Sequence, residues 1–159
     1  MPDELLFLLT LLSAIGTALV AGVFYAFSAF LMRALSRLPP AQGIAAMQSI
    51  NVAVINPWFL IVFLGTAATC AVVAFQGMLI SDERAGLFML GGSALYLVGT
   101  FLLTMAANVP LNNRLAKADP AAADSAELWR RYLKNWTRWN HVRTIAAILA
   151  LLLLMLGLY

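Results

Sequence analysis

Four apolar stretches, each at least 18 residues long, limit what this chain of 159 residues can fold into. They cover residues 5–32, 57–80, 86–107 and 142–159. A helix needs about 20 mostly apolar residues to cross the hydrocarbon core of a bilayer, and in lipid its backbone groups must be hydrogen-bonded internally. The pattern therefore predicts an all-α fold, a four-helix transmembrane bundle, in one integral membrane domain over residues 1–159.

The composition agrees with a chain whose main partner is the lipid bilayer. Hydrophobic residues make up 63% of the chain and charged residues 11%, whereas soluble domains carry roughly 25% charged residues. The formal net charge of +3 is not evidence for nucleic acid, because membrane proteins collect Lys and Arg in their cytoplasmic loops. We expect no nucleic-acid partner, and a homo-oligomer is left open.

The connection between the first and second spans carries clear helix signals. Pro39-Pro40 ends the first helix, because proline removes a backbone donor and clashes with the preceding turn. Residues 42–54 then predict a short amphipathic helix, with apolar side chains at helical spacing. Asn56-Pro57 predicts an N-cap followed by proline at the first helical position of the second span.

The third and fourth spans are joined by a polar segment whose ends are also predictable. Pro110 is expected to kink or end the third helix. Asp124 and Glu127 have the spacing of a capping box, and Glu127 can instead pair with the arginines one turn later. With no Gly or Pro before residue 157, the fourth helix is predicted to be continuous from about 125 to near 159.

Positive residues are distributed unequally among the connections. The first connection (33–56) and the third (108–138) carry eight of the ten Lys and Arg residues, and the second (81–85) carries one. By the positive-inside rule, the first and third connections are cytoplasmic and both termini face outward. The short helix then lies in the first cytoplasmic loop, and the fourth helix extends into the cytoplasm. In a bacterium this would be an inner-membrane protein.

This topology gathers polar and aromatic residues at the cytoplasmic boundary of the bundle. They form either an aromatic belt with snorkelling cations or the floor of a membrane-embedded pocket, where indoles stack and amides orient carbonyl or hydroxyl groups. Asn51 is either part of this pocket or a satisfied, half-buried amide. Arg143 either reaches a lipid phosphate or turns inward toward Asn51, Asn108 and Asn112.

Metal and cofactor chemistry has few candidate ligands in the spans. Every Asp and Glu lies in a terminus or a loop, and His141 and Cys70 are the only histidine and cysteine. A bundle di-iron site needs several inward Glu residues, and zinc or copper sites need more nitrogen or sulfur ligands. A haem between His141 and Met47 or Met105 is the remaining alternative. We expect no metal and no cofactor.

Four short runs combine these features in a recognisable order. They are Phe24-Tyr-Ala-Phe-Ser28, Met47-Gln-Ser-Ile-Asn51, Asn108-Val-Pro-Leu-Asn112 with Arg114, and Trp136-Thr-Arg-Trp-Asn140-His-Val-Arg143. The runs resemble the anthrone oxygenase-like family, four-span integral membrane proteins long listed as a domain of unknown function. The resemblance covers nearly the whole chain. It implies the four-span fold and, by analogy with fungal members, oxidation of anthrones to anthraquinones without a metal or organic cofactor.

The resemblance also implies site residues. An anthrone loses a proton to give a phenolate-like anion that reacts with O₂ itself, so the protein needs a base, an anion site and a dry pocket. Carried over by position, the motif residues are Asn51, Asn108, Asn112, Trp136, Asn140 and Arg143. Arg143 is the candidate anion site, and His141, which is not among these motif residues, is the candidate base. With Trp139 and Phe27, which the helix face and the topology add, the candidate substrate-binding residues are Asn51, Asn108, Asn112, Trp136, Trp139, Asn140 and Phe27.

Two functions from different classes follow from these observations. The first is binding of a small hydrophobic aromatic or quinoid molecule in the pocket at the cytoplasmic boundary, with the physiological role unassigned. The alternative is a cofactor-independent anthrone-type oxygenase that oxidises a phenolic or polyketide substrate with O₂.

Overall fold

The computed structural model describes residues 3–80 and 82–159, and the regular secondary structure of these residues is helical, with no strand. Ser81, the first residue of the predicted second connection, lies outside the described residues. The elements in chain order are α1 (Asp3–Ala26), η1 (Phe27–Leu31), α2 (Met32–Leu35), α3 (Pro40–Ala53), α4 (Pro57–Gly77), α5 (Glu83–Ala94), η2 (Leu95–Leu102), η3 (Thr104–Asn108), α6 (Val109–Ala116) and α7 (Ser125–Leu156). The predicted all-α fold is confirmed.

Four of the described helices are long and apolar enough to cross a membrane: Asp3–Leu35, Pro57–Gly77, Glu83–Ala116 and Ser125–Leu156. The first runs through η1 into α2, and the third runs through η2 and η3 into α6, so π-helical turns lie inside two of the spans. Large apolar side chains such as Leu19, Ile61 and Val98 remain exposed on the outer faces. Outward apolar faces of this kind suit contact with lipid tails.

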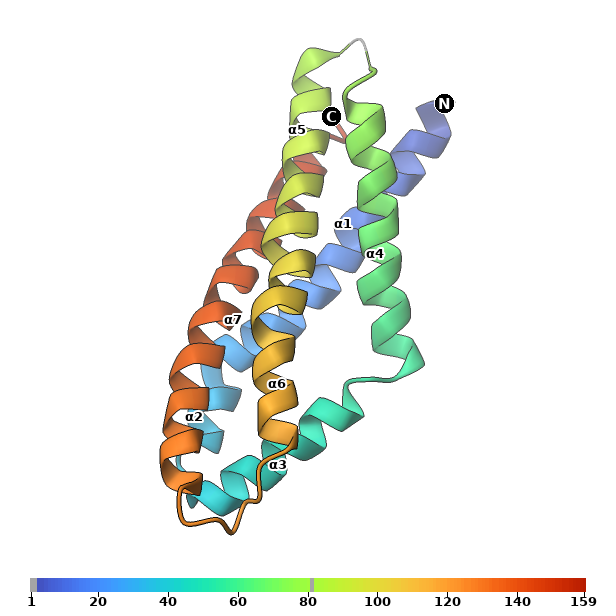
Figure 1. Ribbon diagram of the computed structural model, residues 1–159. Coiled ribbons are helices and arrows are strands. Elements are labelled where there is room, and N and C mark those ends of the chain that lie inside the picture. Colours follow the sequence, from blue (N-terminus) through green and yellow to red (C-terminus); the bar gives the residue numbers. More distant parts are fainter. Residues whose placement is uncertain (1–2, 81) are drawn as a thin grey trace.

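The four long helices form an elongated bundle (Figure 1). Helix α1 packs against α4 and α7, and α5 completes the ring by packing against the same two helices. Both marked ends of the chain lie at the end of the bundle that holds the α4–α5 connection, whereas α3 lies across the opposite end (Figure 1). Helix α3 contacts α6 and α7 there. The predicted short helix in the first connection is therefore confirmed.

Two clusters of buried apolar side chains stabilise this arrangement. One fills the centre of the bundle and includes Phe24, Phe63, Val73, Met89, Tyr96 and Leu154. The other lies under α3 and includes Met32, Ile44, Met47, Leu115, Trp129, Tyr132 and Trp136. The second cluster fixes the part of α7 that precedes the membrane-spanning part.

The predicted start of α4 is confirmed. Asn56 is the N-cap, its Oδ1 accepts from the backbone N–H of Phe59 at 3.1 Å, and Pro57 occupies the first turn. The predicted capping box at α7 is wrong. Asp124 makes no side-chain cap hydrogen bond. Glu127 instead pairs with Arg130 at 2.9 Å and Arg131 at 2.6 Å, because these cations lie one turn further along the same face.

Pro110 was expected to kink or end the third helix, and the second of these alternatives is wrong. The helix continues through Pro110 to Ala116, so it extends beyond the predicted span of 86–107. Proline disrupts a helix by removing an i−4 hydrogen bond and by clashing with the carbonyl of residue i−4. The π-helical segment η3 lies immediately before Val109 and Pro110. Its wider i−5 register relieves that constraint, so the chain stays helical.

Helix α7 runs without interruption from Ser125 to Leu156, which confirms the predicted long fourth helix. At 1.5 Å per residue, 32 residues reach about 48 Å, which exceeds the hydrocarbon core of about 30 Å. Its first turns therefore project beyond the core. Gly43 allows α3 to lie against this projecting part, because a Cβ at Gly43 would be 2.7 Å from the Trp129 indole.

Candidate functional site

The guanidinium of Arg143 is buried inside the bundle, with only 4% of the residue exposed. Its Nε and Nη2 donate to Asn140 Oδ1 at 3.0 and 2.8 Å, and its Nη1 donates to Thr104 Oγ1 at 3.3 Å. The centroids of the Phe24 and Trp136 rings lie 3.8 and 4.9 Å from its Cζ atom. Of the two alternatives for Arg143, the structure therefore shows the inward one.

No carboxylate in the described part of the chain pairs with the Arg143 charge. An unpaired charge in hydrocarbon is costly, about 2.5–3.5 kcal/mol on insertion scales. Two aromatic faces offset part of this cost, because each desolvated cation–π contact contributes up to about 2 kcal/mol. The side-chain oxygen of Asn140, Oδ1, supplies the remaining negative potential. The predicted inward partners Asn51, Asn108 and Asn112 do not bond to Arg143.

The Asn140 amide connects Arg143 to the first span. Its Nδ2 donates to the backbone carbonyl of Phe24 at 2.8 Å and to Ser28 Oγ at 2.7 Å. Asn140 is fully buried. All polar atoms of its side chain are engaged, so the amide has one orientation, with its oxygen toward Arg143 and its nitrogen toward α1 and η1.

Ser28 extends this network to His141. Ser28 Oγ lies 3.0 Å from His141 Nδ1 and 3.1 Å from Thr144 Oγ1. Thr144 donates its hydroxyl proton to the Asn140 backbone carbonyl at 2.7 Å, so Ser28 is the donor when its contact with Thr144 is a hydrogen bond. Ser28 also accepts from Asn140, and this arrangement assigns the proton of the His141 contact to His141 Nδ1. Neutral His141 then has Nε2 free as an acceptor.

Exposure separates His141 from Arg143. His141 lies on the outer side of α7 and is exposed, whereas Asn140 and Arg143 face the bundle interior. The two candidate catalytic residues are thus linked by one hydrogen-bond chain through Ser28 and Asn140, but they do not face a common cavity. The Arg143 guanidinium is enclosed by its partners.

A second polar cluster joins α6 and η3 to α7. Asn112 Oδ1 accepts from Tyr132 OH at 2.9 Å and from Trp136 Nε1 at 2.8 Å. Asn108 Nδ2 donates to the Trp136 backbone carbonyl at 3.2 Å. The Phe27 ring packs on the Trp136 indole with centroids 5.2 Å apart. These groups bond mainly to one another, and the buried atoms Asn108 Oδ1 and Asn51 Nδ2 have no hydrogen-bond partner among the residues that the structure describes.

The structure thus brings together most of the predicted site residues, namely Phe27, Asn108, Asn112, Trp136, Asn140 and Arg143. Trp139 lies apart from them, 37% exposed and with the Arg138 guanidinium 5.8 Å from its ring centroid. Their roles in binding or catalysis stay predictions. Sequence reasoning did not single out Ser28 or Thr144, although Ser28 ends one of the four runs that carry the resemblance.

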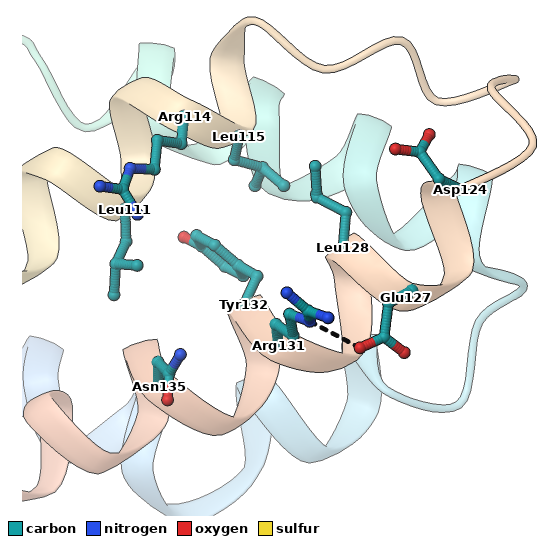
Figure 2. A pocket seen from close by; sticks show the side chains of 9 residues that line it. All are labelled: Leu111, Arg114, Leu115, Asp124, Glu127, Leu128, Arg131, Tyr132 and Asn135. Carbon is teal, nitrogen blue, oxygen red and sulfur yellow. Dashed lines mark hydrogen bonds and ion pairs between the residues drawn. The ribbon is translucent and has the colours of Figure 1, made fainter.

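Two grooves flank this part of α7. The α6–α7 groove, of about 500 Å³, is lined by Leu111, Arg114, Leu115, Asp124, Glu127, Leu128, Arg131, Tyr132 and Asn135. Figure 2 shows Arg131 turned to Glu127 on one wall and Leu111, Arg114 and Leu115 on the other. The His141 groove, of about 700 Å³, is lined by Ser28, Met32, Arg33, Ser36, Leu133, Lys134, Thr137, Arg138, His141 and Val142. Only the His141 groove touches the Arg143–Asn140–Ser28 chain.

The polar groups at the site are imidazole, guanidinium, amide and hydroxyl side chains. Among the residues that the structure describes, no three His, Cys, Asp or Glu side chains gather in a group able to hold a metal ion. What the His141 groove offers is an imidazole whose orientation is fixed by a serine, an apolar floor and a cationic rim. Such a site can remove a proton from a weakly acidic aromatic molecule.

Comparison with known proteins gives one match. A family model described as anthrone oxygenase matches residues 58–153, which is more than half of the chain. The matched region extends from the start of α4 through α5 and α6 to Leu153 in α7. No curated protein and no solved structure matches the chain.

Proposed function

The chain belongs to the anthrone oxygenase family, and we propose that it oxidises a phenolic aromatic substrate with O₂ in the His141 groove. The observation that carries this proposal is the 3.0 Å contact between His141 Nδ1 and Ser28 Oγ. It leaves Nε2 as the acceptor of an imidazole that lines an open groove. A base with a fixed tautomer beside an apolar surface is what proton removal from a weak carbon acid requires.

For an anthrone, the proposed reaction is R₂CH₂ + O₂ → R₂C=O + H₂O. His141 Nε2 accepts a proton from the CH₂ carbon, and the anion left behind is delocalised into its phenolate form. This anion transfers electrons to O₂ and forms a C–O bond, and the resulting peroxide takes the proton back from His141 to give a hydroperoxide. Removal of the second C–H proton then breaks the O–O bond and expels hydroxide, which combines with that proton as water and leaves the ketone. O₂ is the only oxidant, so the reaction balances without a further reductant.

Arg143 fits a positioning role in this proposal. Its donors are engaged by Asn140 and Thr104, so it does not reach the groove as a direct anion contact. Through Asn140 it fixes Ser28, and Ser28 in turn fixes the imidazole. In this proposal Arg143 holds Asn140 in place, Asn140 holds Ser28, and Ser28 holds the imidazole of His141.

The test is turnover of 1,8-dihydroxyanthrone by the purified protein in phosphatidylcholine nanodiscs. O₂ uptake and anthraquinone absorbance are followed together, and empty nanodiscs give the rate of spontaneous oxidation. We expect His141→Ala to lower kcat by about 10²- to 10⁴-fold, the usual contribution of a general base, and added imidazole to restore part of it. Asn113→Ala, at an exposed position outside the groove, is the matched control. Full activity of His141→Ala would refute the proposed base.

A non-catalytic binder of quinoid molecules is the second candidate function, and one observation favours it. Asn51 Nδ2 and Asn108 Oδ1 are a buried donor and a buried acceptor without partners, and such groups are costly unless a ligand or water satisfies them. A binder would hold 1,8-dihydroxyanthraquinone without consuming O₂, and Asn108→Ala would weaken that binding. Turnover that depends on His141 would exclude this candidate.

We also propose that both termini face outward. Two features support this orientation: the excess of Lys and Arg in the first and third connections, and the location of both marked chain ends with the α4–α5 connection, opposite α3 (Figure 1). The His141 groove then lies at the cytoplasmic boundary, where soluble enzymes can deliver its substrate.

A further inference from the structure

The rim of the His141 groove carries an unbalanced positive charge. Arg33, Lys134 and Arg138 line it together with His141, and the lining contains no Asp or Glu. None of these three cations forms an ion pair among the residues that the structure describes; the ion pairs there join Glu127 to Arg130 and Arg131. The three charges are therefore free to attract an anion.

The α6–α7 groove provides an internal comparison. It is also open, and it lies on the same end of α7, but its two arginines, Arg114 and Arg131, face two carboxylates, Asp124 and Glu127. One of these carboxylates is already bound to Arg131 at 2.6 Å (Figure 2). Its lining charge is balanced. A surplus of cations is thus a property of the His141 groove and not of every surface at this end of the bundle.

We infer that the substrate of the His141 groove is an aromatic carboxylate, an inference that rests on the proposed function. The carboxylate would bind Arg33, Lys134 and Arg138 at the rim, and the ring would lie on the apolar side chains of the lining, Met32, Leu133 and Val142. In this position the ring lies beside Ser28 and His141, and its weakly acidic carbon lies next to the His141 imidazole that removes the proton. A groove of about 700 Å³ is within the usual size of sites for small ligands.

Carboxylate recognition follows from the kinds of cation at the rim. Arginine forks match the two oxygens of a carboxylate, and lysine adds a mobile point charge. The attraction is electrostatic and solvent-exposed, so it weakens with ionic strength. It acts on substrate binding and not on proton removal, because the carboxylate lies away from the reacting carbon.

A matched pair of probes tests the inference: 1,8-dihydroxyanthrone and its 3-carboxylate for turnover, and the two corresponding anthraquinones for binding. Measurements use the full chain in phosphatidylcholine nanodiscs, so that no anionic lipid competes. We expect the carboxylates to have the lower KM and Kd. Arg33→Gln, Lys134→Gln and Arg138→Gln should each raise these values for the carboxylates about two- to fivefold, the range for exposed ion pairs.

The same substitutions should raise the KM of the neutral anthrone less than that of its carboxylate, because the neutral probe has no carboxylate for the rim cations to bind. Arg37→Gln is the control, since Arg37 is exposed, lies near Arg33 in the sequence and does not line the groove. Raising the salt concentration should reproduce the effect of the substitutions for the carboxylates alone. Equal KM and Kd for the charged and neutral probes would overturn the inference, and so would an Arg37→Gln effect as large as those of the groove variants.

Turnover of both anthrones with equal KM would overturn the inference that the substrate is a carboxylate, whereas the proposed oxygenase function would stand. Charge-dependent binding of the anthraquinones without any turnover would do the reverse: the oxygenase would fail, and the groove would remain a site for aromatic carboxylates.

Discussion

Replacing Asn140 by Ala tests whether a single amide holds the Arg143 charge inside the bundle. The substitution removes two hydrogen bonds from Arg143, at 3.0 and 2.8 Å, and two bonds to Phe24 and Ser28, at 2.8 and 2.7 Å. Hydrogen bonds to charged groups contribute about 1.5–3 kcal/mol, and neutral ones in membrane bundles average about 0.6 kcal/mol. Both Arg143 donors share the single Asn140 oxygen, so we count them as one charged hydrogen bond beside the two neutral ones. We therefore expect the free energy of unfolding to fall by about 3–4 kcal/mol.

The measurement that isolates this effect is a double-mutant cycle with Arg143→Met. Arg143→Met alone leaves the buried Asn140 oxygen unsatisfied, whereas the double variant removes both the charge and its acceptor. The double variant should be more stable than the sum of the single losses predicts, with a coupling of about 2 kcal/mol. Unfolding by SDS in mixed micelles, followed by tryptophan fluorescence, gives all four values. Additive single effects would refute the reasoning that Asn140 compensates the Arg143 charge.

The other predictions concern local packing, capping and topology. Gly43→Ala places a methyl group 2.7 Å from the Trp129 indole, so it should destabilise the docking of α3 by about 1–3 kcal/mol and speed amide exchange in that helix; unchanged exchange would contradict this. Asp82→Ala should lower the free energy of unfolding by about 0.5–2 kcal/mol, because Asp82 Oδ1 accepts from two backbone N–H groups. Asp124→Ala loses no such bond and should leave that free energy unchanged. Equal losses of stability for the two variants in thermal unfolding would contradict the capping argument. In a Cys70→Ala background, a cysteine that replaces Asp82 should react with a membrane-impermeant reagent from outside only. Labelling from the cytoplasmic side alone would show that the topology is the opposite one.

The long-range architecture was predictable because each long helix leaves a strong local signal. Apolar length predicted the four spans, and the Asn56-Pro57 pair predicted the start of α4 to the residue. Pro39 and Pro40 predicted the break before α3 in the same way. Each of these signals depends on residues that are close together in the chain, where sterics and capping act directly.

The contacts within the site could not be predicted in this way. Asn140 bonds to Phe24 and Ser28, which are 116 and 112 residues away, and His141 reaches Ser28 across 113 residues. No periodicity within one helix specifies such partners. Sequence reasoning grouped Asn140 and Arg143 with Trp136, which the contacts bear out, but it paired Arg143 with the asparagines of the other helices instead of the one a single turn away.

Helical register explains why these partners were hidden. Ser28 lies in η1, Thr100 in η2, and Thr104 and Asn108 in η3. Each of these four residues hydrogen-bonds to α7 between Trp136 and Thr144. A π-helical turn holds an extra residue, so the side chains beyond it are rotated by about 100° relative to an uninterrupted α-helix. Face assignments made with a period of 3.6 residues therefore fail beyond these turns.

All three π-helical segments supply partners to the same stretch of α7, and such irregular turns occur often at functional sites. The widened turns are thus the structural means by which two separate spans direct polar side chains at Asn140 and Arg143.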